Sequence, residues 1–107
     1  MHGIAEEKVP GGKLLRIKVE CDTVVKNVQI SGDFFLHPEE SIKELENSFF
    51  GISADMDENS IAGLIEEVIR SQNIEMIGVS APDIARVLKK AVDNARSVGN
   101  EKADSRK

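Results

Sequence analysis

The sequence predicts an α+β fold, in which a three-stranded antiparallel sheet is followed by three helices packed on one face. Apolar residues alternate with period two near the start of the chain, and they recur at helical spacing in the remainder. The length of 107 residues suits one domain. We expect this domain over residues 1–98, because residues 99–107 are almost entirely polar and predict a disordered tail.

The strands are expected before residue 35. Residues 4–9 predict a short edge strand, and Pro10-Gly11-Gly12 predicts a chain reversal, since glycine permits positive φ. Residues 13–21 alternate, with an inward set of Leu15, Ile17, Val19 and Cys21 opposed by Arg16, Lys18 and Glu20. A tight turn at Asp22-Thr23 joins them to a third strand. Its inward set is expected to be Val24, Val28, Ile30 and Phe34, opposed by Asn27, Gln29 and Ser31.

Three helices are expected after the strands. His37-Pro38-Glu39-Glu40 opens the first, because proline and acidic residues suit a first turn, and Gly51 is placed to end it. The second begins near Asp55 or Asp57 and ends near Gln72, and the third begins at the capping-box-like Ser80-Ala81-Pro82-Asp83. Their apolar stripes are Ile42, Leu45 and Phe49, then Ile61, Leu64, Ile65, Val68 and Ile69, then Ile84, Val87, Leu88, Ala91, Val92, Ala95 and Val98.

Residues that could carry catalysis or hold a metal do not group in the sequence. Gly11-Gly12-Lys13 lacks the P-loop spacing and leads into a strand, where a P-loop leads into a helix. His2 and His37 form no ligand pair. Cys21 is the single cysteine, which excludes an internal disulfide, and its inward position is typical of an inert thiol. We therefore expect no catalytic residue, no metal site and no cofactor bound by this chain.

Charge is distributed unevenly along the chain. The net charge is -5, and residues 33–75 alone contain 11 acidic and 2 basic residues. An acidic segment repels phosphate backbones, so we expect no nucleic-acid partner, and a basic protein surface is the better match. No apolar run approaches the ~18 residues that a membrane span requires, and the N-terminus lacks a signal-peptide pattern. The expected location is the cytoplasm, without membrane contact.

The segment from Ser31 to Phe35 is the strongest candidate for contact with a partner. Gly32 permits a bulge or a close backbone approach, and adjacent Phe residues point in different directions if the chain is extended. Two interpretations remain open: both rings fold under the first helix, or one ring contacts a partner. On the second interpretation we hypothesise a partner-binding set of Gly11, Gly12, Lys13, Gly32, Asp33, Phe34 and Phe35.

The order of motifs between Lys8 and Gly51 resembles the small accessory domain of lipoate-protein ligases. The resemblance is carried by Lys-x-Pro-Gly-Gly-Lys at 8–13, by Ile30-x-Gly32-Asp33-Phe34-Phe35, and by an I-x-x-L-E helix that ends in glycine. The helix matches at Ile42, Leu45, Glu46 and Gly51, and coverage extends more weakly to Val98. One departure is Asp22-Thr23, where the family often has a glycine, and it affects only the turn.

The resemblance implies a non-catalytic accessory subunit, required for lipoate adenylation, in a two-chain ATP-dependent lipoate-protein ligase. The partner in this heterodimer would be the catalytic subunit, which binds lipoate and ATP and transfers the lipoyl group to lipoyl-carrier domains. The fold also resembles that of iron-sulfur scaffold and sulfur-acceptor proteins, which gives an alternative function that uses Cys21. That alternative requires a reactive cysteine on a loop, whereas Cys21 belongs to the inward set of a strand.

Overall fold

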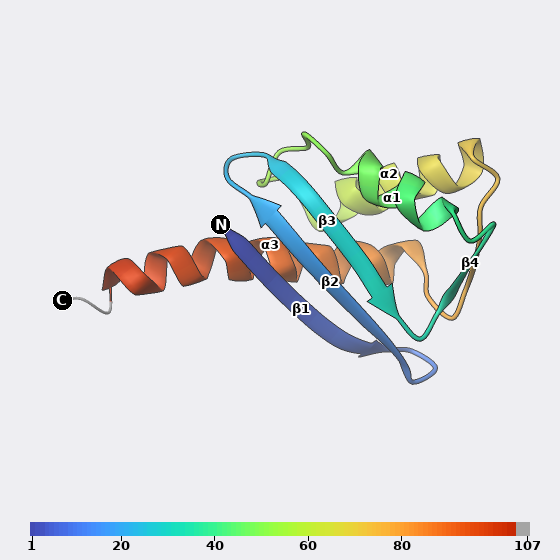
Figure 1. Ribbon diagram of the computed structural model, residues 1–107, viewed down its shortest axis with the longest axis horizontal. Helices are drawn as coiled ribbons and strands as arrows, with labels where there is room; N and C mark the ends of the chain where they lie inside the picture. The colour runs from blue at the N-terminus through green and yellow to red at the C-terminus, as the bar shows by residue number, and fades with distance from the viewer. Residues whose placement is uncertain (105–107) are drawn as a thin grey trace.

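A three-stranded antiparallel sheet with helices on one face forms the domain (Figure 1). The computed structural model describes the backbone of residues 1–104 and the side chains of residues 1–97. The sheet order is β1 (His2–Val9), β2 (Lys13–Cys21) and β3 (Val25–Gly32). Helix α3 (Ala81–Asp104) packs on β1 and β2, α2 (Glu58–Ser71) packs on α3, and α1 (Ser41–Ser48) lies beside β3. The predicted fold class is confirmed.

Strand β2 is the centre of the core, as its alternation predicts. Its four inward residues are at most 3% exposed, and they lie under α3. The β1–β2 connection reverses at Gly11 and Gly12, whose φ angles are +96° and +80°. These values lie in the left-handed region that glycine adopts at little cost, so the predicted turn is confirmed.

The predicted inward set of the third strand was wrong at its first residue. Val24 is 38% exposed, whereas Val25 is 1% exposed and belongs to the core. Glu20 lies opposite Asn27, but Cys21 lies opposite Val25, so β3 carries one extra residue at this point. Such a bulge reverses the facing of the residues on one side of it, and a strict period of two cannot anticipate this.

A second, two-stranded sheet was not predicted. Strand β4 (Phe35–His37) pairs antiparallel with β5 (Glu75–Ile77), and Phe35 lies opposite Ile77. Three residues are too few to show a period in sequence. The first helix also starts later than predicted, because Ser41 N–H donates to Pro38 O at 3.0 Å in a turn that precedes α1.

The boundaries of α2 and the start of α3 follow the predicted caps. Asp57 Oδ1 accepts from Ser60 N–H at 2.7 Å, which decides between the two candidate caps of α2. Ser80 Oγ lies 2.8 Å from Asp83 Oδ2, and Asp83 N–H donates back to Ser80 Oγ at 3.4 Å. Helix α3 continues beyond Val98 to Asp104, and the expected disorder of the residues after 98 stays a prediction.

The physical reason for the longer helix is composition. One glycine at 99 costs a helix only about 1 kcal/mol, and the Glu-Lys-Ala sequence after it favours helix. The rest of the expected tail, residues 105–107, lies outside the described residues.

Salt bridges between Glu7 of β1 and two basic residues of α3 hold the strand against the helix. Glu7 faces α3, although it lies on an edge strand. Arg86 Nε donates to Glu7 Oε2 at 2.8 Å, and Lys90 Nζ donates to Glu7 Oε1 at 2.8 Å. The hydrogen bonds from Arg86 and then from Lys90 lower the pKa of Glu7 from 4.5 to about 2. An inward-facing charge of this kind also discourages edge-to-edge aggregation.

We expect Glu7→Gln to reduce stability in a pH-dependent way. Because the pKa of Glu7 is lower in the folded protein than in the unfolded chain, its carboxylate stabilises the fold fully above about pH 4.5 and loses this effect as the pH falls toward 2. The side chain is 22% exposed, so we expect a modest loss of about 1–2 kcal/mol at neutral pH, shrinking through this window.

Urea unfolding at several pH values measures this difference. Glu6→Gln is the matched control, because the Glu6 side chain is 49% exposed and pairs with Arg16 at 3.3 Å on the outer face. A Glu7→Gln penalty that stays constant between neutral pH and pH 3 would contradict the prediction.

Candidate partner-binding site

The segment Gly32–Phe35 lies at the same end of the sheet as the β1–β2 turn (Figure 1). Asp33 N–H donates to Leu14 O at 2.9 Å, which attaches this corner to the first residues of β2. Gly32 has a φ of +150°, and a Cβ at this position would contact Leu14 O. A side chain at residue 32 would therefore separate the corner from β2.

Lys13 and Phe34 both lie next to Gly78. A Cβ on Gly78 would lie 3.4 Å from Lys13 Cγ and 3.5 Å from Phe34 Cβ. The structure thus brings Lys13 together with residues 32–35, as the hypothesis required. Gly11 and Gly12 differ, because no atom lies within 4 Å of a Cβ placed on either, so they project at the tip of the turn.

The two Phe residues of the corner have different environments. Phe34 is partly buried and packs against the core, whereas Phe35 is 67% exposed. Leu36, the next residue of β4, is buried at 7% exposure, so the alternation of an extended chain separates the rings. This excludes the interpretation in which both rings fold under the first helix.

Sequence reasoning missed a second apolar residue of this surface. Ile77, the cross-strand neighbour of Phe35 on β5, is 51% exposed. Directly paired residues place their side chains on the same face, so the two form one exposed apolar patch. The sequence held no usable signal for it, because the three residues Glu75-Met76-Ile77 are too few to show a strand period.

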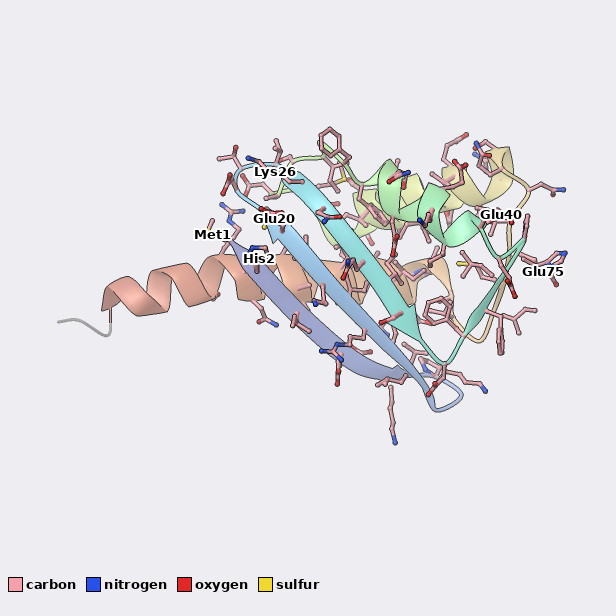
Figure 2. The ribbon with its side chains drawn as sticks, in the orientation of Figure 1. Met1, His2, Glu20, Lys26, Glu40 and Glu75 are labelled. Carbon is pink, nitrogen blue, oxygen red and sulfur yellow. The ribbon has the colours of Figure 1, made fainter. Side chains whose placement is uncertain are left out.

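A hollow and acidic side chains adjoin the exposed Phe35. The hollow, of about 310 Å³, lies between β3, β4 and the start of α1, and its lining includes Ile30, Gly32, Phe35, Glu39 and Ile42. Figure 2 shows Glu40 and Glu75 at this end of the molecule, near β4. An apolar centre beside acidic side chains fits a partner surface that has an apolar pocket and a basic rim.

The part of the chain with described side chains contains no group of three or more His, Cys, Asp or Glu that could hold a metal. Cys21 is fully buried, and this burial raises the pKa of its thiol. A buried neutral thiol is a poor nucleophile and a poor cluster ligand. Within the described helices, none has the length and apolarity to cross a bilayer.

An α+β domain with an exposed aromatic corner, and with its one thiol buried, has the properties of a partner-binding subunit. Comparison with known proteins identifies which one. The chain is 32% identical over 80 residues to lipoate-protein ligase A subunit 2 of Thermoplasma acidophilum. The aligned region covers 71% of this chain and 77% of that protein. No family model matches.

A solved structure gives the same result. It describes an archaeal lipoylation system, a bipartite lipoate protein ligase and its E2 lipoyl domain from Thermoplasma acidophilum. One chain in it is similar to this protein with a TM-score of 0.65 and 30% identity, over 82% of this chain and 97% of that chain. The protein therefore belongs to the lipoate-protein ligase A subunit 2 family. This supports the role of an accessory ligase subunit and not the iron-sulfur alternative.

Proposed function

We propose that this chain is the non-catalytic subunit of a two-chain, ATP-dependent lipoate-protein ligase, and that it is required for lipoate adenylation. Its membership of the subunit 2 family carries the proposal. The exposed Phe35 patch, next to a corner that is hydrogen-bonded to β2, adds a rigid surface for the second subunit. The protein is proposed to act in the cytoplasm as one half of a heterodimer.

The division of labour follows from the chemistry. The catalytic subunit is proposed to bind lipoate and ATP, to form lipoyl-adenylate with release of pyrophosphate, and to transfer the lipoyl group to a lipoyl-carrier domain. This chain would dock through its corner and order the active-site loops of the catalytic subunit. Lys13 and Asp33 flank the corner and are proposed to fix the register of docking, while Gly32 holds it against β2. Gly11 and Gly12 would let the adjoining turn approach the partner closely.

We expect pyrophosphate release only when both subunits are present. With lipoate and ATP, the isolated chain should release none, and its addition should raise the rate of the catalytic subunit until the two are equimolar. A coupled pyrophosphate assay of each chain and of the mixture measures this, and the mixture without lipoate is the control. Pyrophosphate release by the isolated chain, or no stimulation in the mixture, would refute the proposed function.

A further inference from the structure

A seam, the line along which α1 lies beside β3, continues past the corner. A second hollow, of about 360 Å³, is lined by Asn27, Val28, Glu46, Asn47, Phe50 and Lys26. The first hollow is lined from the same two elements by Ile30, Gly32 and Ile42. Ile42 and Glu46 lie four residues apart on one face of α1, and Phe50 follows in the turn just after the helix. Both hollows therefore belong to one seam.

Main-chain groups of β3 face this seam. The bond from Asp33 N–H to Leu14 O fixes the alternation of the β2–β3 ladder, in which Val28 and Ile30 point their N–H and C=O groups away from β2. Glu46 Oε2 accepts from Ile30 N–H at 2.7 Å. The seam thus offers strand-edge groups for pairing, with one carboxylate bridging its middle.

The two exposed Phe rings lie at the two ends of the seam. Phe35 is 67% exposed at one end, and Phe50 is 73% exposed at the other. The remaining two Phe residues pack in or against the core, and Phe49 is fully buried although it directly precedes Phe50. Large apolar rings left in water beside an open groove are typical of an interaction site.

Charge identifies the occupant. Helix α1 and the turn before it carry Glu39, Glu40, Glu44 and Glu46 against one lysine, Lys43. Lys26, at the far end, is paired with Asp22 at 3.1 Å. A second copy of this chain would bring a second acidic seam against the first, which like-charge repulsion disfavours. A basic segment fits better.

We propose that this seam binds one extended, basic segment of the catalytic subunit, which rests apolar side chains on Phe35 and on Phe50. This rests on the proposed function, which supplies the catalytic partner. An extended chain can pair with Val28 N–H and with the carbonyl groups of Val28 and Ile30, while Ile30 N–H stays bonded to Glu46. A cation between the apolar ends of that chain meets the Glu46 carboxylate. The proposal adds Phe50 and Glu46 to the partner-binding set.

Calorimetric titration of the chain into the catalytic subunit tests the proposal. Phe50→Ala should raise Kd about tenfold or more, as expected for an aromatic anchor. Ile4→Ala is the matched control, because Ile4 is 45% exposed on β1 at the opposite edge of the sheet, and its Kd should stay within about twofold of wild type. Glu46→Gln keeps an acceptor for Ile30 N–H but removes the negative charge. Because salt screens attraction between charges, this variant should bind more weakly than wild type mainly at low salt.

Hydrogen exchange of the unmutated chain provides a second readout. The amide of Val28 should exchange more slowly in the complex than in the free chain, while that of Ile4 should not change. If wild type binds but Phe50→Ala binds as tightly as Ile4→Ala, the seam is not the site, and the proposed function survives. If the Val28 amide exchanges at the same rate in the complex and in the free chain, the seam inference is likewise refuted. If wild type does not bind the catalytic subunit, the proposed function itself fails.

Discussion

Gly3→Ala should destabilise the domain by about 3 kcal/mol or more, a large share of the 5–15 kcal/mol that stabilises a typical domain. A Cβ on Gly3 would contact Ala91 O and would lie 2.6 Å from Ala95 N and 2.8 Å from Ala95 Cβ. These are mostly backbone atoms of α3, which cannot rotate aside as a side chain would. The added methyl group must push β1 away from the helix.

The same substitution at Gly63 is the matched control. Gly63 lies inside α2, and no atom lies within 4 Å of a Cβ placed there. Gly63→Ala should therefore stabilise the domain by about 0.5–1 kcal/mol through helix propensity. Urea unfolding of both variants should give opposite signs. An unchanged stability of Gly3→Ala would mean that the start of β1 does not pack on α3 in solution.

The close approach at Gly3 also shows what sequence patterns leave out. Period-two alternation predicts that residue 3 faces the same side as Ala5 and Val9, but it does not reveal which helix lies beneath them. The Glu7 and Arg86 pair has the same origin, since its partners lie far apart in the sequence. Contacts of this kind depend on tertiary packing, which local patterns do not encode.

Predictions succeeded where local chemistry decides the structure. The alternation of β2, the glycine turn at 11–12 and the cap at Ser80 each depend on residues close in sequence, and each is confirmed. The register at Val25 failed because a bulge interrupts the period. Strands β4 and β5 are held by pairing across the chain, so neither segment shows a strand pattern of its own.

The candidate site also has some features that local sequence predicted and others that only the folded chain revealed. Adjacent Phe residues after a glycine already predicted that one ring can be exposed, although the sequence did not show which one. Ile77 and the seam along α1 became visible only when the chain was folded, because each depends on pairing or packing between distant segments. The resemblance at residues 8–51 identified the family independently of these details.

Phe35→Ala should weaken binding to the catalytic subunit by about 2 kcal/mol or more, as expected for an aromatic residue at the centre of an interface. The ring is 67% exposed, so its removal deletes little internal packing, and the melting temperature should change by only a few degrees. Phe34→Ala should instead lower stability and leave binding nearly unchanged. That ring is partly buried against the core, so its loss should cost about 2 kcal/mol of stability, less than for a fully buried Phe.

Calorimetric titration against the catalytic subunit, paired with thermal melts, separates the two effects. The expected result is weaker binding with an intact fold for Phe35→Ala, and lower stability with near-normal binding for Phe34→Ala at a temperature where it remains folded. Ile77→Ala should resemble Phe35→Ala with a smaller loss of affinity, because Ile77 extends the same patch but is 51% exposed and lacks an aromatic ring. If Phe35→Ala and Ile77→Ala both bind as wild type does, the β4–β5 patch does not contact the catalytic subunit, and any interface must lie elsewhere on the domain.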